Sequence, residues 1–317
     1  MGFSSEAFPM GEQPQVKTDL FRVRHVTRYS YARPVRFGRH RAMFRPHETP
    51  ELRLLTMTVD TRPEAQVHWI HDVFSNSVTL FDFNEPSDTL EIGCTFDIVR
   101  TSFREAEFPV AEHARGFPFQ YDEHERTDLA ACLAPRHDDP DGAVRSLAAR
   151  FEREAGGDTW GLLTGMTQGI KAELSYLRRE EPGVQDPAET LALGSGSCRD
   201  YAELMCELAR RLGFAARFVT GYLYDPALDA RTADAPSDVQ GAGATHAWVQ
   251  IFLPGAGWIE FDPTNGDVAS GKLIRTGVGR VPSQVAPLTG FFDGRPTDAL
   301  GLEVSVDITT LAPPLVQ

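Results

Sequence analysis

Cys198 is the residue of this chain whose surroundings most clearly favour chemistry. It follows the run Gly194-Ser195-Gly196-Ser197, in which two glycines permit a tight turn. After it, apolar residues recur at the three-to-four spacing of a buried helix face: Tyr201, Met205, Leu208 and Leu212. Gly213 is placed to end this helix. A cysteine at a helix start lies among unpaired N–H groups at the positive end of the helix dipole, which favours the nucleophilic thiolate.

A cysteine nucleophile needs a base, and His246 is the only histidine in the second half of the chain. It lies in residues 244–252, an apolar, β-prone run that predicts a strand. A second predicted strand, residues 257–265, carries Asp262. Antiparallel pairing of the two strands would bring Asp262 beside the imidazole. We therefore expect nucleophile, base and orienting group in the order Cys198, His246, Asp262.

The segments that hold these residues resemble the transglutaminase-like core, and more narrowly a family of bacterial transglutaminase-like proteins described as cysteine proteases. The likeness rests on Gly-Ser-Cys-Arg-Asp-Tyr-Ala at 196–202, Arg-Phe-Val-Thr-Gly-Tyr at 217–222, Thr-His-Ala-Trp-Val at 245–249 and Gly-Trp-Ile-Glu-Phe-Asp-Pro-Thr-Asn at 257–265. Upstream, three segments resemble the family's N-terminal β-domain: residues 25–31, Arg45-Pro46 and residues 72–76. The resemblance implies a papain-like arrangement, in which a helix bears the cysteine and an antiparallel sheet bears the histidine and the aspartate.

The pattern of the chain changes from strand-rich to helix-rich, which predicts an α+β protein of two domains. Short alternating runs broken by turn signals predict an N-terminal β-sandwich. The expected parts are a flexible tail at 1–19, the β-domain at 20–105, a linker of limited structure at 106–140, the catalytic core at 141–295, and a C-terminal strand and tail at 296–317. The linker's histidines, at 113, 124 and 137, are expected in solvated loop.

The expected chemistry is attack of the Cys198 thiolate on the carbonyl of a peptide or isopeptide amide, which forms an acyl-enzyme. His246 would carry the proton to the leaving amine, and the backbone N–H of Cys198 would stabilise the oxyanion. Water as the second reactant gives hydrolysis, which we favour. An amine gives transglutaminase-type acyl transfer or ligation. A non-catalytic scaffold that binds partners is the third alternative.

Three aromatic residues are candidates for the substrate cleft. Tyr176 follows a predicted helix, at a position where the resemblance implies an aromatic residue. Trp248 and Trp258 flank the expected base and orienting group, and we expect them to form walls of the site.

Two further segments bear on specificity. Val281-Pro282 stand where the resemblance implies aspartate and tyrosine, so substrate preference is open at this point. Residues 225–243 form an acidic insertion between two expected active-site strands, with four aspartates against one arginine. We expect this insertion either to gate the cleft or to be a plain connector.

The composition excludes several classes of protein. A net charge of −14 over 317 residues disfavours a nucleic-acid partner. No apolar run approaches the ~20 residues of a membrane span, and the N-terminus lacks the pattern of a secretory signal. The four cysteines have neither metal-ligand nor disulfide spacing. We therefore expect no metal, no cofactor, no membrane and a cytoplasmic location.

Residues 22–45 depart from the acidic balance, since they hold eight arginines and no acidic residue. One interpretation is a pair of solvated strand faces. The other is a docking surface for an acidic partner or for a second copy of the chain. The partner expected at Cys198 is a peptide or protein substrate.

Overall fold

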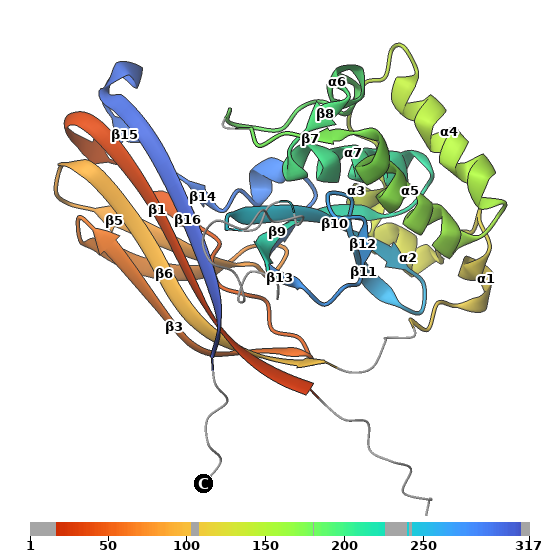
Figure 1. Cartoon of the computed structure of the whole chain (residues 1–317), viewed down its shortest axis with the longest axis horizontal. Helices are drawn as coiled ribbons and strands as arrows, with labels where there is room; N and C mark the ends of the chain where they lie inside the picture. Colours follow the sequence, from red (N-terminus) through yellow and green to blue (C-terminus); the bar gives the residue numbers. More distant parts are fainter. Residues whose placement is uncertain (1–16, 103–107, 180, 226–239, 241–242, 312–317) are drawn as a thin grey trace, which may run out of the picture.

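The computed structural model describes residues 17–102, 108–179, 181–225, 240 and 243–311. Its N-terminal part is built from strands, and its second part packs helices against a sheet (Figure 1). The predicted α+β class, with a β-rich region ahead of a mixed core, is confirmed.

Two sheets that share one apolar core form the N-terminal β-domain. Its first six strands are β1 (Lys17–Phe37), β2 (His40–Ala42), β3 (Leu52–Arg62), β4 (Ala65–His71), β5 (Ser77–Phe83) and β6 (Ser87–Ser102). In β1, the buried Phe21 and Val23 alternate with the exposed Arg22 and Arg24. This period of two places one face of the strand in the core and the other in solvent.

The end of the chain returns to the β-domain. The last three strands of the chain are β14 (Leu288–Thr289), β15 (Phe292–Asp293) and β16 (Ala299–Leu311). Both β15 and β16 pair with β1. The sheet orders are β15-β1-β6-β3, with β16 also on β1, and β14-β2-β5-β4. The expected boundary at 295 therefore differs from the structure, in which residues from 288 onward pair with the β-domain. A period of two predicts a strand, but it does not indicate a partner at the other end of the chain.

The core is a five-stranded sheet with helices packed on it. Its strands, in the order β12-β11-β10-β9-β13, are β9 (Ala216–Leu223), β10 (Thr245–Leu253), β11 (Gly257–Asp262), β12 (Asp267–Val268) and β13 (Leu273–Gly279). Its helices are α4 (Ala143–Ala155), α5 (Thr159–Glu173), α6 (Pro187–Leu193) and α7 (Cys198–Arg211), and the 3-10 turn η1 (Pro282–Gln284) follows β13. A second 3-10 turn, η2 (Pro296–Asp298), lies against β1 of the β-domain. The predicted apolar face of α7 is buried at Tyr201, Met205 and Leu208. No helix of the described residues is long and apolar enough to span a membrane.

The expected linker at 106–140 has more structure than its polar composition suggested. It contains α1 (Glu112–Arg115), α2 (Glu123–Asp128) and α3 (Ala130–Leu133). Asp122 caps α2 by accepting from the backbone N–H of Glu125 at 2.8 Å. Leu129 and Cys132 are buried in one cluster with Ala215. Helices this short expose too few apolar positions for a 3.6-residue period to appear in the sequence.

The β-domain holds the core sheet through buried hydrogen bonds. Asn76, fully buried, donates from its side-chain amide to the Val278 carbonyl at 2.7 Å and accepts from the Val278 N–H at 2.8 Å. The imidazole of His25 lies 2.9 Å from the hydroxyl of Tyr222. Asn76 thus binds strand β13, and His25 binds strand β9. Two of the segments that resemble the family's β-domain therefore hold the sheet that carries the site.

Candidate active site

Cys198 is the first residue of α7, and two short strands position it. β7 (Ser175–Tyr176) and β8 (Ser195–Gly196) form a parallel pair directly before the helix. Among the four cysteines, Cys198 is partly exposed, whereas the other three are buried. The accessible thiol therefore lies at the helix terminus that stabilises negative charge.

His246 and Asp262 lie together on neighbouring antiparallel strands, β10 and β11. The Nε2 of His246 is 2.8 Å from Oδ2 of Asp262, and both side chains are about 1% exposed or less. Asp262 also accepts from the side-chain amide of Asn265 at 2.8 Å and from the backbone N–H of Thr264 at 3.0 Å. These bonds fix the carboxylate and, through it, the imidazole plane.

The other ring nitrogen of His246, Nδ1, is buried and has no hydrogen-bond partner within 3.5 Å in the described part of the chain. Cys198 is one of the groups that raise the pKa of this imidazole. Burial alone would lower the pKa of His246. The charge of Asp262 and its hydrogen bond, together with Cys198, outweigh burial and raise the pKa to about 10. The imidazole is therefore protonated at neutral pH, beside the thiol.

Tyr176 lies beside Cys198 as well. Its strand pairs in register with Gly196, two residues before the thiol. Burial raises the pKa of the Tyr176 hydroxyl, and Cys198 raises it further through charge and a hydrogen bond. The phenol is consequently a neutral donor next to the sulfur, partly buried on the wall of the site.

The two candidate tryptophans have different places. Trp248 is fully buried and stacks on His246, with ring centroids 6.0 Å apart. It can hold the imidazole but has no surface for substrate. Trp258 lies near the opposite end of β11 from Asp262, where the Arg217 guanidinium stands 4.1 Å from its ring. The structure does not bring Trp258 to the thiol.

Comparison with known proteins assigns this arrangement to a family. Residues 21–99 match the bacterial transglutaminase-like N-terminal region, and residues 145–263 match the transglutaminase-like superfamily. The chain belongs to the bacterial transglutaminase-like family. The resemblance drawn from its motifs is thereby confirmed, and membership supports an enzyme of thiol-dependent amide chemistry in general.

Relatives of this transglutaminase-like protein match nearly its whole length. The uncharacterised protein ML0607 of Mycobacterium leprae is 26% identical over 292 residues, which cover 92% of this chain and 99% of the relative. Rv2569c of Mycobacterium tuberculosis is 26% identical over 323 residues, with 93% and 94% covered. A solved structure described as a "putative cysteine protease" from Cytophaga hutchinsonii has a TM-score of 0.65 at 17% identity and covers 95% and 93% of the two chains. The fold of both domains is therefore shared.

A buried carboxylate connects the parts of this transglutaminase-like site. Asp200, in the first turn of α7, is fully buried. It accepts from the backbone N–H and the hydroxyl of Ser197 at 2.8 and 2.7 Å. It also accepts from the Gln185 N–H at 2.8 Å and from the Arg179 guanidinium at 2.8 and 2.9 Å. Asp200 thus ties the turn before Cys198 to the segment that follows Tyr176.

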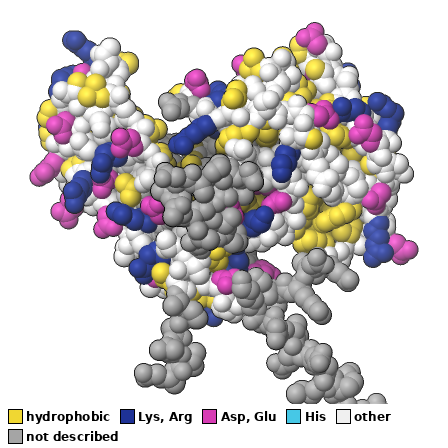
Figure 2. Space-filling view, in the orientation of Figure 1, with side chains coloured by type: hydrophobic (Ala, Val, Ile, Leu, Met, Phe, Trp, Pro, Cys, Tyr) yellow, Lys and Arg dark blue, Asp and Glu magenta, His cyan; other side chains and the backbone are white. Residues whose placement is uncertain are grey.

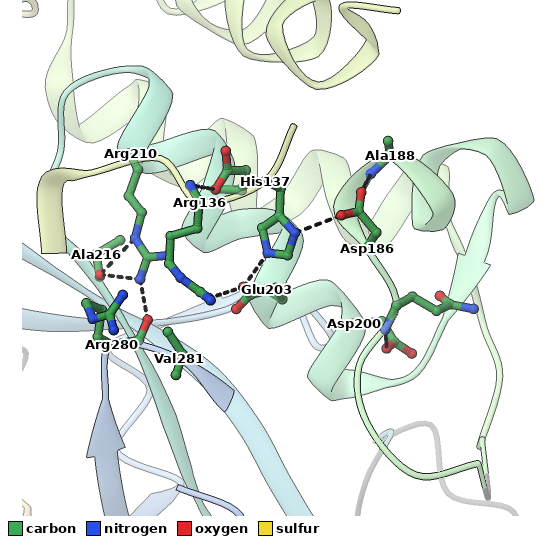
Figure 3. A network of polar contacts seen from close by, with 12 residues as sticks. Arg136, His137, Asp186, Ala188, Asp200, Glu203, Arg210, Ala216, Arg280 and Val281 are labelled. Atoms are coloured by element: carbon green, nitrogen blue, oxygen red, sulfur yellow. Dashed lines mark hydrogen bonds and ion pairs between the residues drawn. The ribbon is translucent and has the colours of Figure 1, made fainter. Parts of the chain in front are cut away.

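A second polar network joins the loop at residues 136–137 to Asp186, which precedes α6, and to Glu203 of α7 (Figure 3). His137 stands between two carboxylates, with Nδ1 2.7 Å from Asp186 and Nε2 2.7 Å from Glu203. The hydrogen bond to Glu203 is the main cause that raises the pKa of His137, against burial. His137 lies in a loop, as expected, but the expectation that it is solvated was wrong, because it is partly buried and paired with two carboxylates. Its partners are distant in sequence, so no local pattern could indicate them.

The remaining sequence candidates lie away from the thiol or outside the described residues. Val281 is buried, and its N–H donates to the side chain of Gln284 at 3.3 Å, so this departure from the family pattern packs inside the protein. Most of the acidic insertion at 225–243 lies outside the described residues. Within the part of the chain that is described, no group of three or more His, Cys, Asp or Glu side chains could hold a metal ion.

The arginines of residues 22–45 are largely paired within the β-domain. Six of the eight form ion pairs with carboxylates of the same chain: Arg22, Arg28, Arg33, Arg39, Arg41 and Arg45. Figure 2 shows basic and acidic side chains interspersed over this part of the surface. This arrangement fits solvated strand faces, and the acidic-partner interpretation stays a prediction.

Proposed function

We propose that this transglutaminase-like protein hydrolyses peptide or isopeptide amide bonds through a triad of Cys198, His246 and Asp262. The observation that carries the proposal is the buried imidazole of His246, which is bound to Asp262 through Nε2 at 2.8 Å and whose Nδ1 has no hydrogen-bond partner among the described residues. A nucleophile, a base and an orienting group in this relation activate a thiol for acyl chemistry.

In the first step, the Cys198 sulfur attacks the amide carbonyl, and a C–S bond forms as the carbonyl oxygen becomes an oxyanion. The imidazolium of His246 then gives its proton to the amine nitrogen as the C–N bond breaks. In the second step, His246 takes a proton from water as the water oxygen attacks the thioester carbonyl. The C–S bond then breaks, which releases the acid and restores the Cys198 thiolate beside the imidazolium. Asp262 stabilises the imidazolium in both steps, consistent with the raised pKa of about 10 for His246.

The oxyanion needs donors that point at it before the reaction begins. The backbone N–H of Cys198, at the start of α7, is one. We assign the second to the hydroxyl of Tyr176, because the raised pKa keeps this phenol protonated beside the sulfur. A Tyr176→Phe variant should therefore lose kcat more than it changes KM.

Hydrolysis is preferred over transfer because water needs no binding site, whereas an acceptor amine needs a second one. The alternative, transfer of the acyl group to an amine, uses the same acyl-enzyme. Turnover of a peptide amide with and without methylamine distinguishes them: release of free acid supports hydrolysis, and a methylamide as the main product contradicts it.

The triad itself is tested by labelling and by turnover. Iodoacetamide should modify Cys198 in the native protein, and His246→Ala should slow that labelling. Cys198→Ala and His246→Ala should each abolish turnover, and the double variant should cost little more, since the residues act as a unit. The matched control is Cys132→Ala, which removes a buried thiol of α3. Equal activity in Cys198→Ala and in Cys132→Ala would contradict the proposal.

A further inference from the structure

The first residues of β16, among which Glu303 is the only charged one, form an edge strand whose apolar face is uncovered. Within the described residues, β16 pairs with β1 only. Val306 is 5% exposed and belongs to the β-domain core, whereas Leu302, on the same face of the strand, is 56% exposed. Leu300, in the bulge where the register with β1 shifts, is 67% exposed. The face of the strand that is buried at Val306 therefore comes to the surface at its beginning.

A pocket adjoins this exposed face. Its volume is about 430 Å³, and aromatic rings and aliphatic side chains line it: Tyr29, Tyr31, His40, Phe291, Phe292, Leu300 and Leu302. None of the lining residues is acidic, lysine or arginine. Burial lowers the pKa of His40, so its imidazole is neutral at physiological pH. Phe291 is 67% exposed, which leaves a large ring at the mouth. Such a pocket suits an aromatic or large aliphatic side chain.

The free edge of β16 already forms one backbone hydrogen bond with another segment. The N–H of Val306 donates to the carbonyl of Gly243 at 3.2 Å. Because backbone groups of alternate residues point to the same side of an antiparallel strand, those of Val304 and Leu302 also point to the free side. Gly243 lies three residues before His246. The open edge therefore continues from the point where the chain turns into the active-site strand, and β16 lies on the side of its sheet that faces the core (Figure 1).

We propose that the edge of β16 at residues 299–304 and the aromatic pocket bind an extended segment of the polypeptide substrate. The segment adds as a further strand, with main-chain hydrogen bonds to Leu302 and Val304, and places an aromatic or large aliphatic side chain in the pocket. A substrate chain fits better than a second copy, because two copies that each carry −14 repel each other. The proposal rests on the proposed function, since the bound segment belongs to the chain that Cys198 attacks.

Binding is measured on the Cys198→Ala protein, so that the probe is not consumed. The probe is a fluorescein-labelled peptide of alternating Thr and Val with one central Phe, and its partner probe has Asp in place of Phe. We expect the Phe peptide to bind at least about tenfold more tightly than the Asp peptide. Leu300→Asp should remove that preference. Leu55→Asp, at a position on β3 that is 53% exposed, is the matched control and should keep it.

Hydrogen exchange locates the bound strand. The amides of residues 302 and 304 should exchange more slowly when the Phe peptide is added, and those of β3 should not change. Equal binding of the two peptides, equal binding by Leu300→Asp and Leu55→Asp, or protection elsewhere would overturn the proposal. So would a dimer in analytical ultracentrifugation that Leu300→Asp dissociates, because the edge would then be an interface between copies.

Turnover separates this proposal from that of the triad. With active protein, Leu300→Asp should raise KM for an unfolded protein substrate such as carboxymethylated lactalbumin by about tenfold. The same variant should leave kcat/KM for a dipeptide amide unchanged, since a dipeptide cannot reach the edge. If neither substrate is turned over and Cys198 is not labelled, the proposed function fails while the binding result stands. If both are turned over and Leu300→Asp changes neither, the β16 site alone fails.

Discussion

Strand β1 and helix α7 both carry many charges, but they hold them in opposite ways. The arginines of β1 that pair with Asp97, Glu91 and Asp298 keep 50% to 59% of their side chains exposed. The carboxylates of α7, at Asp200, Glu203 and Glu207, are 2% exposed or less and are bound by hydrogen bonds or ion pairs. Exposed pairs contribute little because solvent already satisfies them, whereas a buried charge that loses its partners is costly.

This difference teaches that the density of charge along a segment is a poor guide to its importance. Residues 22–45 attract attention as sequence, yet their charges are mostly compensated at the surface. A single aspartate after the cysteine attracts little attention, yet it holds the turn before the nucleophile. The four predictions below test this contrast.

Asp262→Asn should have the largest effect, because it removes the charge that keeps His246 protonated. We expect kcat to fall by about 10³ to 10⁴. The raised pKa of about 10 for His246 places the alkaline limb of the native pH profile near pH 10, where the imidazolium loses its proton. In the variant, that limb should move toward the ordinary histidine value of about 6.5.

The measurement is kcat/KM against pH for a peptide amide. Asp267→Asn, on the neighbouring strand β12 and opposite Asp262 in the register, is the matched control and should leave the profile in place. An alkaline limb that stays near its native position in Asp262→Asn would show that another group sets it.

Asp200→Asn should be the most destabilising change of a carboxylate in the molecule. An amide at this position presents its own donors to the N–H groups of Ser197 and Gln185. It also leaves Arg179 with only the exposed Glu181, 3.8 Å away, as a counter-ion. We expect the free energy of unfolding to fall by about 3–5 kcal/mol, the range for breaking a buried ion pair. Asp97→Asn, which removes the partner of Arg22 at the surface, is the control, and its change should lie within experimental error.

Chemical denaturation measures both variants. A similar loss in the two would break the contrast between β1 and α7. Labelling of Cys198 adds a second measurement, because loss of Asp200 should slow iodoacetamide even under conditions in which the variant is fully folded.

Much of the local structure could be predicted because the signals are short-range. The helix expected between Cys198 and Gly213 is α7 (Cys198–Arg211), and the strand expected at 244–252 is β10 (Thr245–Leu253). The approach of His246 and Asp262 could be predicted as well, since two adjacent strands joined by a tight turn leave few registers. In each case, the residues that decide the structure lie within a few positions of one another.

The rest depends on contacts between distant segments, for which the sequence alone holds no local signal. The return of β16 to β1 fills the open side of a strand at the other end of the chain. His137 has ordinary loop neighbours, and only the packing of its segment against α6 and α7 makes it an ion-pair residue. Asp200 could be read as a helix-dipole residue, but its five hydrogen bonds come from three separate segments.

His137→Gln should reduce stability in a pH-dependent way. The pKa of His137 is raised in the folded protein by Glu203 and Asp186. Its stabilisation is therefore fully present below the unfolded value of about 6.5 and is lost as the pH rises through the raised folded value. We expect the variant to lose about 1 kcal/mol at low pH, a figure discounted for partial exposure, and less at alkaline pH.

Thermal or chemical unfolding, measured from below a pH of about 6.5 up to alkaline pH, checks the effect. His124→Gln, an exposed histidine in α2, is the matched control and should follow the native curve. A constant difference between His137→Gln and the native protein at all pH values would contradict a role for the charged imidazole.

The smallest effect is expected at the surface pair of Arg22 and Asp97. The guanidinium contacts both carboxylate oxygens, at 2.7 and 2.8 Å, so its geometry is good. Its side chain is nevertheless 50% exposed, and solvent can replace the carboxylate at little cost. In a double-mutant cycle with Arg22→Gln and Asp97→Asn, the coupling should be smaller than the uncertainty of the unfolding midpoint at physiological salt. It should vanish at about 1 M salt, where the screening length is about 3 Å. A coupling that persists at that salt, or one as large as the loss in Asp200→Asn, would mean that the charges of β1 are held as firmly as those of α7, and the contrast between the two regions would fail.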